Sequence, residues 1–142
     1  MYFYCEKNYL GQMKLHWIEV PSIKDPRGNL AVLEESKLPF DTKRVFYLYD
    51  VPSGSERGGH ALKTTTQLII PISGSFELVL KDSSEERKVL LNNPVKGVVV
   101  PEMTWRELRN FSAGAVCLVI ASKEYNEKDY IRNWDEFASL SP

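Results

Sequence analysis

One histidine near the middle of the chain has the surroundings expected of a group that moves protons. His60 follows two glycines and begins an apolar run in the segment RGGHALKTTTQLIIPISG, from Arg57 to Gly74. Imidazole titrates closest to neutral pH, so His60 is a candidate general acid and base. The glycines permit a close approach of the backbone to a ligand. The alternative is a buried histidine that hydrogen-bonds only to backbone.

The elements that would position His60 have the pattern of β-strands. Apolar residues alternate at Leu68, Ile70 and Ile72, and alternation resumes over 76–80 after Ser73 and Gly74. This pattern predicts a β-hairpin that turns at the glycine.

The rest of the chain favours the same class of structure. We predict strands over 15–20, 30–34, 43–50, 89–91, 98–100 and 115–122, with turns at 25–29, 39–41 and 92–94, a loop at 52–59 and a hairpin loop at 82–88. Alternation within 43–50 places Arg44, Phe46 and Leu48 on one face and Val45, Tyr47 and Tyr49 on the other. Only 125–140 has helix-like spacing. Many short strands followed by one terminal helix predict an all-β sandwich or small barrel.

Composition limits the class of protein. A chain of 142 residues with 43% hydrophobic and 26% charged residues is expected to form one globular domain over 1–142. The net charge of −1 does not favour nucleic acid or an anionic membrane as a partner. No apolar segment has membrane-spanning length, and the N-terminus lacks the features of a secretory signal. Cys5 and Cys117 are expected to be reduced thiols of a cytoplasmic protein.

Six segments together resemble one family. The chain contains KRVFYLYD, RGGHALK, SGSFELVL, WRELRNFS and SKEYNEKDYIRNWDEF, and DPRGNL earlier. Taken together these segments are similar to the cupin family of nucleotide-sugar 3,4-ketoisomerases. The similarity extends from about Trp17 to Phe137, and the tail from Glu124 to Arg132 is its most distinctive part.

The resemblance implies a fold and an activity. It implies a cupin jelly-roll β-barrel with a short C-terminal helix, paired into a homodimer. The substrate would be a dTDP-linked keto-deoxysugar such as dTDP-4-keto-6-deoxyglucose, bound in the barrel mouth, in deoxysugar biosynthesis for a surface polysaccharide such as lipopolysaccharide. Proton transfer between carbons three and four needs no metal and no organic cofactor. The alternative is a catalytically inactive cupin that binds a nucleotide sugar or has a regulatory role.

The chain departs from the family pattern at positions expected to carry out the chemistry. The family pattern has a second histidine where this chain has Leu62, a tyrosine where it has Phe46, and a histidine where it has Arg106. His60 is therefore the expected catalytic base. Metal-binding cupins use several histidines and a carboxylate, and Gln67 occupies roughly the place of that carboxylate. A single histidine does not make a metal site, so we expect none.

The remaining candidates are expected to bind substrate. They are Arg44, Arg57, Tyr47, Lys63, Gln67, Trp105 and Arg106. Arg57 suits a diphosphate because guanidinium binds phosphate through two hydrogen bonds, but it could be a solvated loop charge. Arg44 is either an edge residue or an anion contact inside the barrel, and Trp105 is either core or a stacking surface. In the tail, Asp129, Arg132 and Glu136 are expected to form a solvated helix face or a dimer contact.

Overall fold

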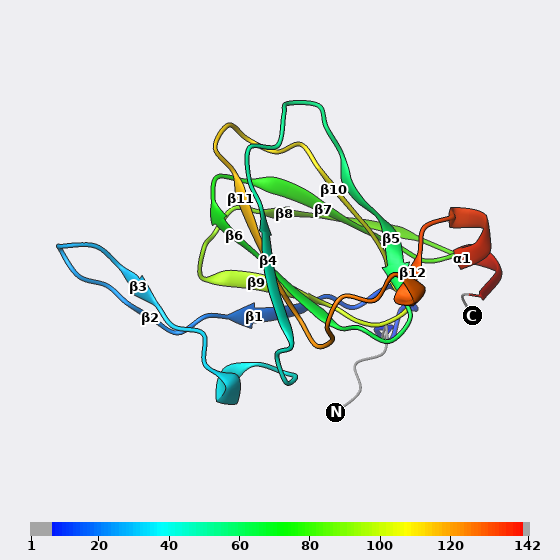
Figure 1. The fold of residues 1–142 in the computed structure, drawn as a ribbon, viewed down its shortest axis with the longest axis horizontal. Coiled ribbons are helices and arrows are strands. Elements are labelled where there is room, and N and C mark those ends of the chain that lie inside the picture. Colours follow the sequence, from blue (N-terminus) through cyan, green and yellow to red (C-terminus); the bar gives the residue numbers. More distant parts are fainter. Residues whose placement is uncertain (1–6, 141–142) are drawn as a thin grey trace.

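The computed structural model describes residues 7–140, so the N-terminal segment with Cys5 lies outside the described residues. Two five-stranded antiparallel sheets face each other (Figure 1). The first sheet has the order β1 (His16–Glu19), β9 (Lys96–Val100), β6 (Gln67–Ser73), β11 (Val116–Ala121) and β4 (Arg44–Leu48). The second has the order β12 (Tyr130–Ile131), β5 (Arg57–Leu62), β10 (Trp105–Arg109), β7 (Phe76–Lys81) and β8 (Glu86–Leu91).

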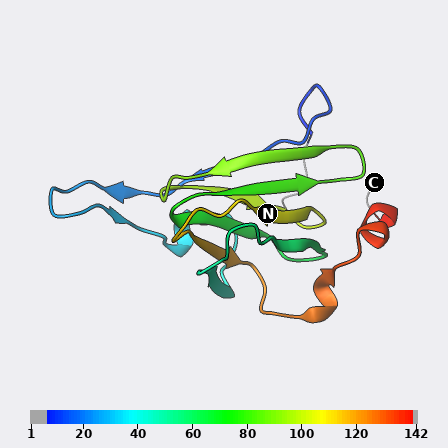
Figure 2. The same cartoon turned by 90° about the horizontal axis from the view of Figure 1, so that it is seen from above.

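The smaller elements complete the chain. They are the hairpin of β2 (Ser22–Ile23) with β3 (Leu30–Ala31), two 3-10 turns at Glu35–Lys37 and Glu127–Asp129, and the helix α1 (Trp134–Leu140). The hairpin projects from the sheets, and α1 lies at the opposite end of the molecule (Figures 1 and 2). Successive strands pass from one sheet to the other, for example from β4 to β5 and from β5 to β6. This arrangement confirms the all-β jelly roll with a short C-terminal helix.

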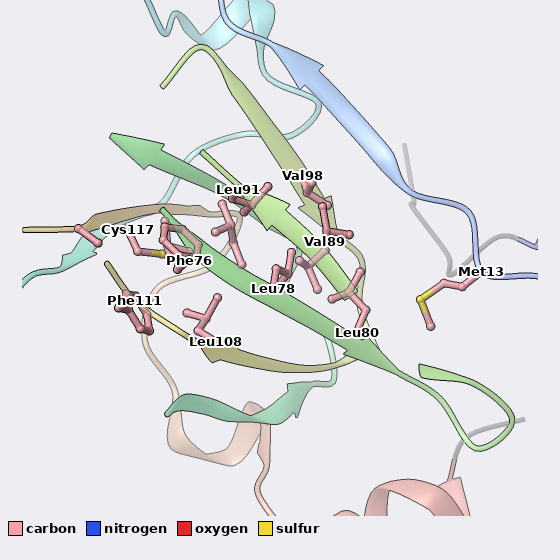
Figure 3. Packing of buried hydrophobic residues seen from close by; sticks show 14 residues of the cluster. Met13, Phe76, Leu78, Leu80, Val89, Leu91, Val98, Leu108, Phe111 and Cys117 are labelled. Atoms are coloured by element: carbon pink, nitrogen blue, oxygen red, sulfur yellow. The ribbon is translucent and has the colours of Figure 1, made fainter. Parts of the chain in front are cut away.

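The main core lies between the sheets. It includes Phe76, Leu78 and Leu80 of β7, which are fully buried or nearly so (Figure 3). Val119 of β11 belongs to the same core. Strand β6 has a continuous apolar run because both of its faces are covered. Ile69 belongs to this core. The adjacent Leu68 and Ile70 belong to a second cluster on the other face of the sheet, against which Leu38 and Phe40 pack.

Part of the outer face of the second sheet is covered by α1. Trp105 and Ala61 pack there with Ile131 and Phe137. Trp105 lies 5.7 Å from Phe137 and 5.3 Å from Trp134, measured between ring centroids. The helix therefore shields the backs of β5 and β10, the two strands that carry His60 and Arg106.

The predicted hairpin at Gly74 is wrong. β6 and β7 belong to different sheets, and the turn between them is a corner of the barrel. The corner packs on the next turn in space, where Ser75 N donates to Ser112 Oγ at 2.9 Å and Ser112 N donates to Ser75 O at 2.8 Å. Gly74 has a φ of +68°, and a Cβ there would meet Ser112 and Ala115. Alternating strands on both sides of a glycine turn are compatible with a hairpin within one sheet and also with a connection between two sheets.

Other boundaries differ as well. The strand predicted over 30–34 is limited to β3, and the helix predicted over 125–140 is limited to α1. The hairpin loop predicted over 82–88 exists between β7 and β8, but β8 already begins at Glu86. Strand β10 was not predicted, because the sequence WRELR is short and highly charged. Among the described helices, none has the length and apolarity needed to span a membrane.

Candidate active site

A cavity of about 420 Å³ lies between the inner faces of the two sheets. It is lined by Phe46, Leu48, Gln67, Ile69 and Val119 from the first sheet, and by Arg57, Gly58, His60, Arg106, Leu108 and Tyr130 from the second, together with Glu56 and Arg132. One wall is therefore largely apolar, and the facing wall carries the imidazole, the phenol and most of the arginines. Such a combination of apolar surface with few polar groups is typical of a ligand site.

A β-bulge brings Arg57 and His60 to the same cavity. Side chains three residues apart on a regular strand point to opposite faces. Here the register with β10 shifts between Arg106 and Glu107, opposite the two glycines, which have φ angles of +85° and +67°. A Cβ on Gly58 would lie 3.0 Å from the Arg106 carbonyl oxygen. The glycine pair is therefore needed for the bulge that gives both side chains access to the cavity.

His60 is held as a neutral imidazole. Its ring is half-buried, and its Nδ1 atom makes no hydrogen bond of normal geometry to any described residue. Burial lowers the pKa of His60 to about 4, and repulsion from Arg106, Arg132 and Arg44 acts in the same direction. The backbone of Gly58 favours the cation and opposes the shift only in part. At neutral pH the ring is therefore free to accept a proton.

Arg106 is a buried cation without a carboxylate partner among the described residues. Its side chain is 2% exposed. Nη1 donates to Gln67 Oε1 at 2.5 Å and Nη2 donates to the Thr104 carbonyl at 3.0 Å, whereas Nε has no hydrogen-bond acceptor in the described part of the chain. Burial lowers the pKa of Arg106 to about 10, which leaves the guanidinium charged near neutral pH. A buried charge bound only by neutral oxygens is prepared for an anionic ligand.

Tyr130 forms the edge of the cavity beside His60. The two rings lie 4.9 Å apart between centroids. The Arg44 Nη1 atom donates to the Tyr130 hydroxyl at 3.4 Å, and the Arg132 guanidinium lies 4.4 Å from the centre of the phenol ring. Arg132 is itself paired with Glu127.

Asp129 fixes the strand that carries Tyr130. Its carboxylate accepts hydrogen bonds from Thr64 N and Oγ1, both at 2.8 Å, and from Thr65 Oγ1 at 2.5 Å. Its carbonyl accepts from Lys63 N at 2.9 Å. The expectation that Asp129 belongs to a solvated helix face is therefore wrong, since this carboxylate is buried in the connection between β5 and β6.

The structure brings together four of the eight predicted site residues. His60, Arg57, Gln67 and Arg106 line one cavity. Arg44 does not line it but contacts its rim through the Tyr130 hydroxyl.

The other three predicted residues lie outside the cavity. Tyr47 is 60% exposed on the outer face of β4, because its neighbour Phe46 points inward. Trp105 points outward beneath α1 for the same reason, because Arg106 takes the inward position. Lys63 follows the end of β5, and its side chain is exposed. In an alternating strand, adjacent residues do not reach the same cavity.

Sequence reasoning missed Glu56, Tyr130 and Arg132 as cavity residues. The available signal was the tail motif, which was recognised as distinctive but interpreted as helix. Residues 130–131 form a strand paired with β5, so Tyr130 and the following Arg132 reach the cavity, which a surface helix would not do. Among residues 7–140, no three His, Cys, Asp or Glu side chains converge as metal ligands, and the absence of a metal stays a prediction.

Comparisons with known proteins identify the family. The family model described as FdtA: WxcM-like, C-terminal, matches residues 13–141. The chain belongs to this family. A TDP-4-oxo-6-deoxy-α-D-glucose-3,4-oxoisomerase from Aneurinibacillus thermoaerophilus is 38% identical over 121 residues, which are 84% of this chain and 87% of the relative.

Solved structures agree with this assignment. The sugar 3,4-ketoisomerase QdtA from Thermoanaerobacterium thermosaccharolyticum, in complex with TDP, superposes with a TM-score of 0.87 at 38% identity, over 89% of this chain and 93% of QdtA. A 3,4-ketoisomerase from Helicobacter canadensis superposes with a TM-score of 0.86 at 41% identity, over 91% and 98% of the two chains. The expected family, the cupin-like fold and the assignment as an isomerase are confirmed.

Proposed function

We propose that this chain moves the carbonyl of a TDP-linked 4-keto-6-deoxyhexose from carbon four to carbon three in the cavity around His60. The observation that carries the proposal is a neutral imidazole in a cavity that also contains a buried, uncompensated guanidinium. A ketoisomerase needs a base that is neutral before reaction and a cation where negative charge develops. Related proteins named for this reaction support the same substrate class.

His60 is assigned the proton transfer at carbon. Its imidazole takes the proton from carbon three as the C4 carbonyl becomes an enediolate oxygen, and the resulting imidazolium returns a proton to carbon four. Arg106 lines the same cavity and stabilises the enediolate by charge-assisted hydrogen bonding. The product is an isomer of the substrate, so the protein is left unchanged.

The remaining arginines are assigned to the diphosphate. Arg57 and Arg132 line the cavity, and Arg44 contacts its rim. A guanidinium group donates two parallel hydrogen bonds to phosphate oxygens, which orients the ligand and strengthens its binding. The apolar side chains of the first sheet lie opposite these charges and exclude water from the reacting part of the cavity.

The direct test is incubation of the purified chain with TDP-4-keto-6-deoxyglucose, followed by NMR spectroscopy. We expect the 3-keto isomer to accumulate in proportion to the amount of protein. Heat-denatured protein is the control for spontaneous isomerisation. Saturable binding without formation of this isomer would contradict the proposed reaction and would instead indicate a binding protein.

The acid limb of the pH profile should report the depressed pKa of His60. Because neutral imidazole is the base, kcat/KM should fall only as the pH drops through about 4, whereas an ordinary histidine titrates near 6.5. Bound diphosphate offsets part of the repulsion from the arginines, so the acid limb of kcat should lie at higher pH than that of kcat/KM. An acid limb of kcat/KM at about 6.5 would contradict this environment for His60.

The chain is also proposed to form a homodimer. Val45 and Tyr47 on the edge strand β4 and Tyr49 just after it are exposed, and the projecting hairpin exposes Ile23 and Leu30. Exposed apolar surface of this kind on a small barrel is typical of an interface. Sedimentation velocity at micromolar concentration should give a dimer, and a stable monomer would contradict it.

The cell compartment is proposed to be the cytoplasm, with the product used in deoxysugar biosynthesis for a surface polysaccharide. Cys117 is a free, buried thiol whose pKa burial raises to about 12, which is consistent with a reducing compartment. Recovery of the protein from a periplasmic or secreted fraction would contradict this location.

A further inference from the structure

The proposed reaction moves protons at two oxygens as well as at two carbons. Oxygen four must gain a proton when its carbonyl becomes a hydroxyl, and oxygen three must lose one when its hydroxyl becomes a carbonyl. His60 holds the carbon-derived proton between these events, so its imidazolium has no free site to accept the proton of oxygen three. A second group that both donates and accepts a proton is therefore required at the same cavity.

Few side chains that line the cavity fit this requirement. The arginines are donors that stay protonated, and Gln67 is an amide already bound to Arg106. Glu56 is largely exposed and paired with Arg109 at 3.3 Å. Tyr130 remains, and a phenol can both donate and accept a proton.

The position of Tyr130 fits a proton carrier beside His60. Its ring lies 4.9 Å from the imidazole, measured between ring centroids, and both residues line the cavity. In the register of β12 with β5, Tyr130 lies opposite Leu62. Leu62 itself is fully buried and does not line the cavity. The phenol therefore comes from the strand next to the position at which the family pattern has its second histidine.

The surroundings of Tyr130 also fit this role. Arg44 donates to its hydroxyl and Arg132 lies over its ring, so negative charge on the phenol oxygen during proton transfer would be stabilised. The three hydrogen bonds to Asp129 hold the strand in place. The phenol is therefore preorganised before substrate binds.

We infer that Tyr130 is the second proton-transfer group of this site, in place of the tyrosine and histidine replaced by Phe46 and Leu62. As His60 removes the proton from carbon three, the Tyr130 hydroxyl gives its proton to oxygen four. As the imidazolium returns a proton to carbon four, the phenolate takes the proton from oxygen three. Both groups end in their starting states, and no oxidant or co-reactant is consumed. The inference rests on the proposed isomerase function.

The test compares Tyr130→Phe with the matched control Tyr125→Phe. Tyr125 packs beside Tyr130 with tilted rings whose centroids are 5.6 Å apart, but it is exposed, its hydroxyl donates to Glu127, and it does not line the cavity. Tyr130→Phe should lower kcat for isomerisation about 100-fold or more, whereas KM changes less than about threefold. Tyr125→Phe should stay within about twofold of the wild type.

Exchange of the carbon-three proton with deuterated solvent separates catalysis from positioning. In Tyr130→Phe, His60 and Arg106 still form the enediolate, so exchange should fall much less than isomerisation. Equal loss of exchange and isomerisation with a raised KM would show that Tyr130 only positions other groups, and would overturn the inference. A rate for Tyr130→Phe within about threefold of an active wild type would also overturn it, whereas an inactive wild type would refute the proposed function itself.

Discussion

Replacing His60 with asparagine should lower kcat for isomerisation by about a hundred- to ten-thousand-fold, the usual contribution of a general acid-base group. Asparagine fills similar space and hydrogen-bonds, but its amide does not take up a proton near neutral pH. Because His60 is the base at carbon, the variant should also lose exchange of the carbon-three proton with solvent. Product formation and deuterium incorporation, both followed by NMR, measure the two effects.

The matched control is the other histidine of the chain. His16 lies on β1, outside the cavity, so His16→Asn should isomerise within about twofold of the wild type. Binding of TDP by His60→Asn should stay within about threefold of the wild type, since the arginines that are assigned to the diphosphate remain. If His60→Asn and the wild type formed product equally fast, the assignment of His60 as base would be wrong.

The sequence predicted the sheets better than their connections. Alternation in KRVFYLYD correctly puts Phe46 and Leu48 on one face and Tyr47 on the other, but it does not say which face is inside, and Tyr47, predicted to bind substrate, lies on the outer face. The link at Gly74 was misassigned because alternation specifies which side chains share a face, but not which strand pairs with which. The turn at Gly74 packs on Ser112 and Ala115, about forty residues away in the chain, and β6 pairs with β9 and β11 rather than with β7.

The residues of the cavity were predictable where the signal is local in the sequence, and not where it depends on contacts between distant segments. The glycine pair next to His60 indicated a special backbone, and the bulge explains how Arg57 joins His60. The contribution of Tyr130 was not predictable from spacing, because it depends on a two-residue strand too short to leave a periodic pattern. The burial of Asp129 likewise depends on hydroxyl and amide donors from Thr64 and Thr65, a non-local contact.

Arg106 is the second position at which we expect a large effect. Arg106→Met should lower kcat about 100- to 1000-fold, the usual cost of removing a donor to a developing oxyanion. The effect should exceed that of losing an ordinary charge, because Arg106 is buried and its ligands in the described residues are neutral oxygens. Methionine retains much of the apolar volume, and replacing a buried charge with such a side chain is commonly tolerated by a fold.

The control for Arg106→Met is Arg109→Met on the same strand. Arg109 pairs with Glu107 at 2.8 Å and does not line the cavity, so its replacement should leave kcat within about twofold. The unfolding midpoint of Arg106→Met should stay within a few degrees of the wild type, and the variant should still bind TDP. Exchange at carbon three and isomerisation should fall together, because both pass through the enediolate. This common loss distinguishes Arg106 from Tyr130, whose loss should affect isomerisation more than exchange. A folded Arg106→Met protein with a wild-type kcat would show that the enediolate is stabilised elsewhere.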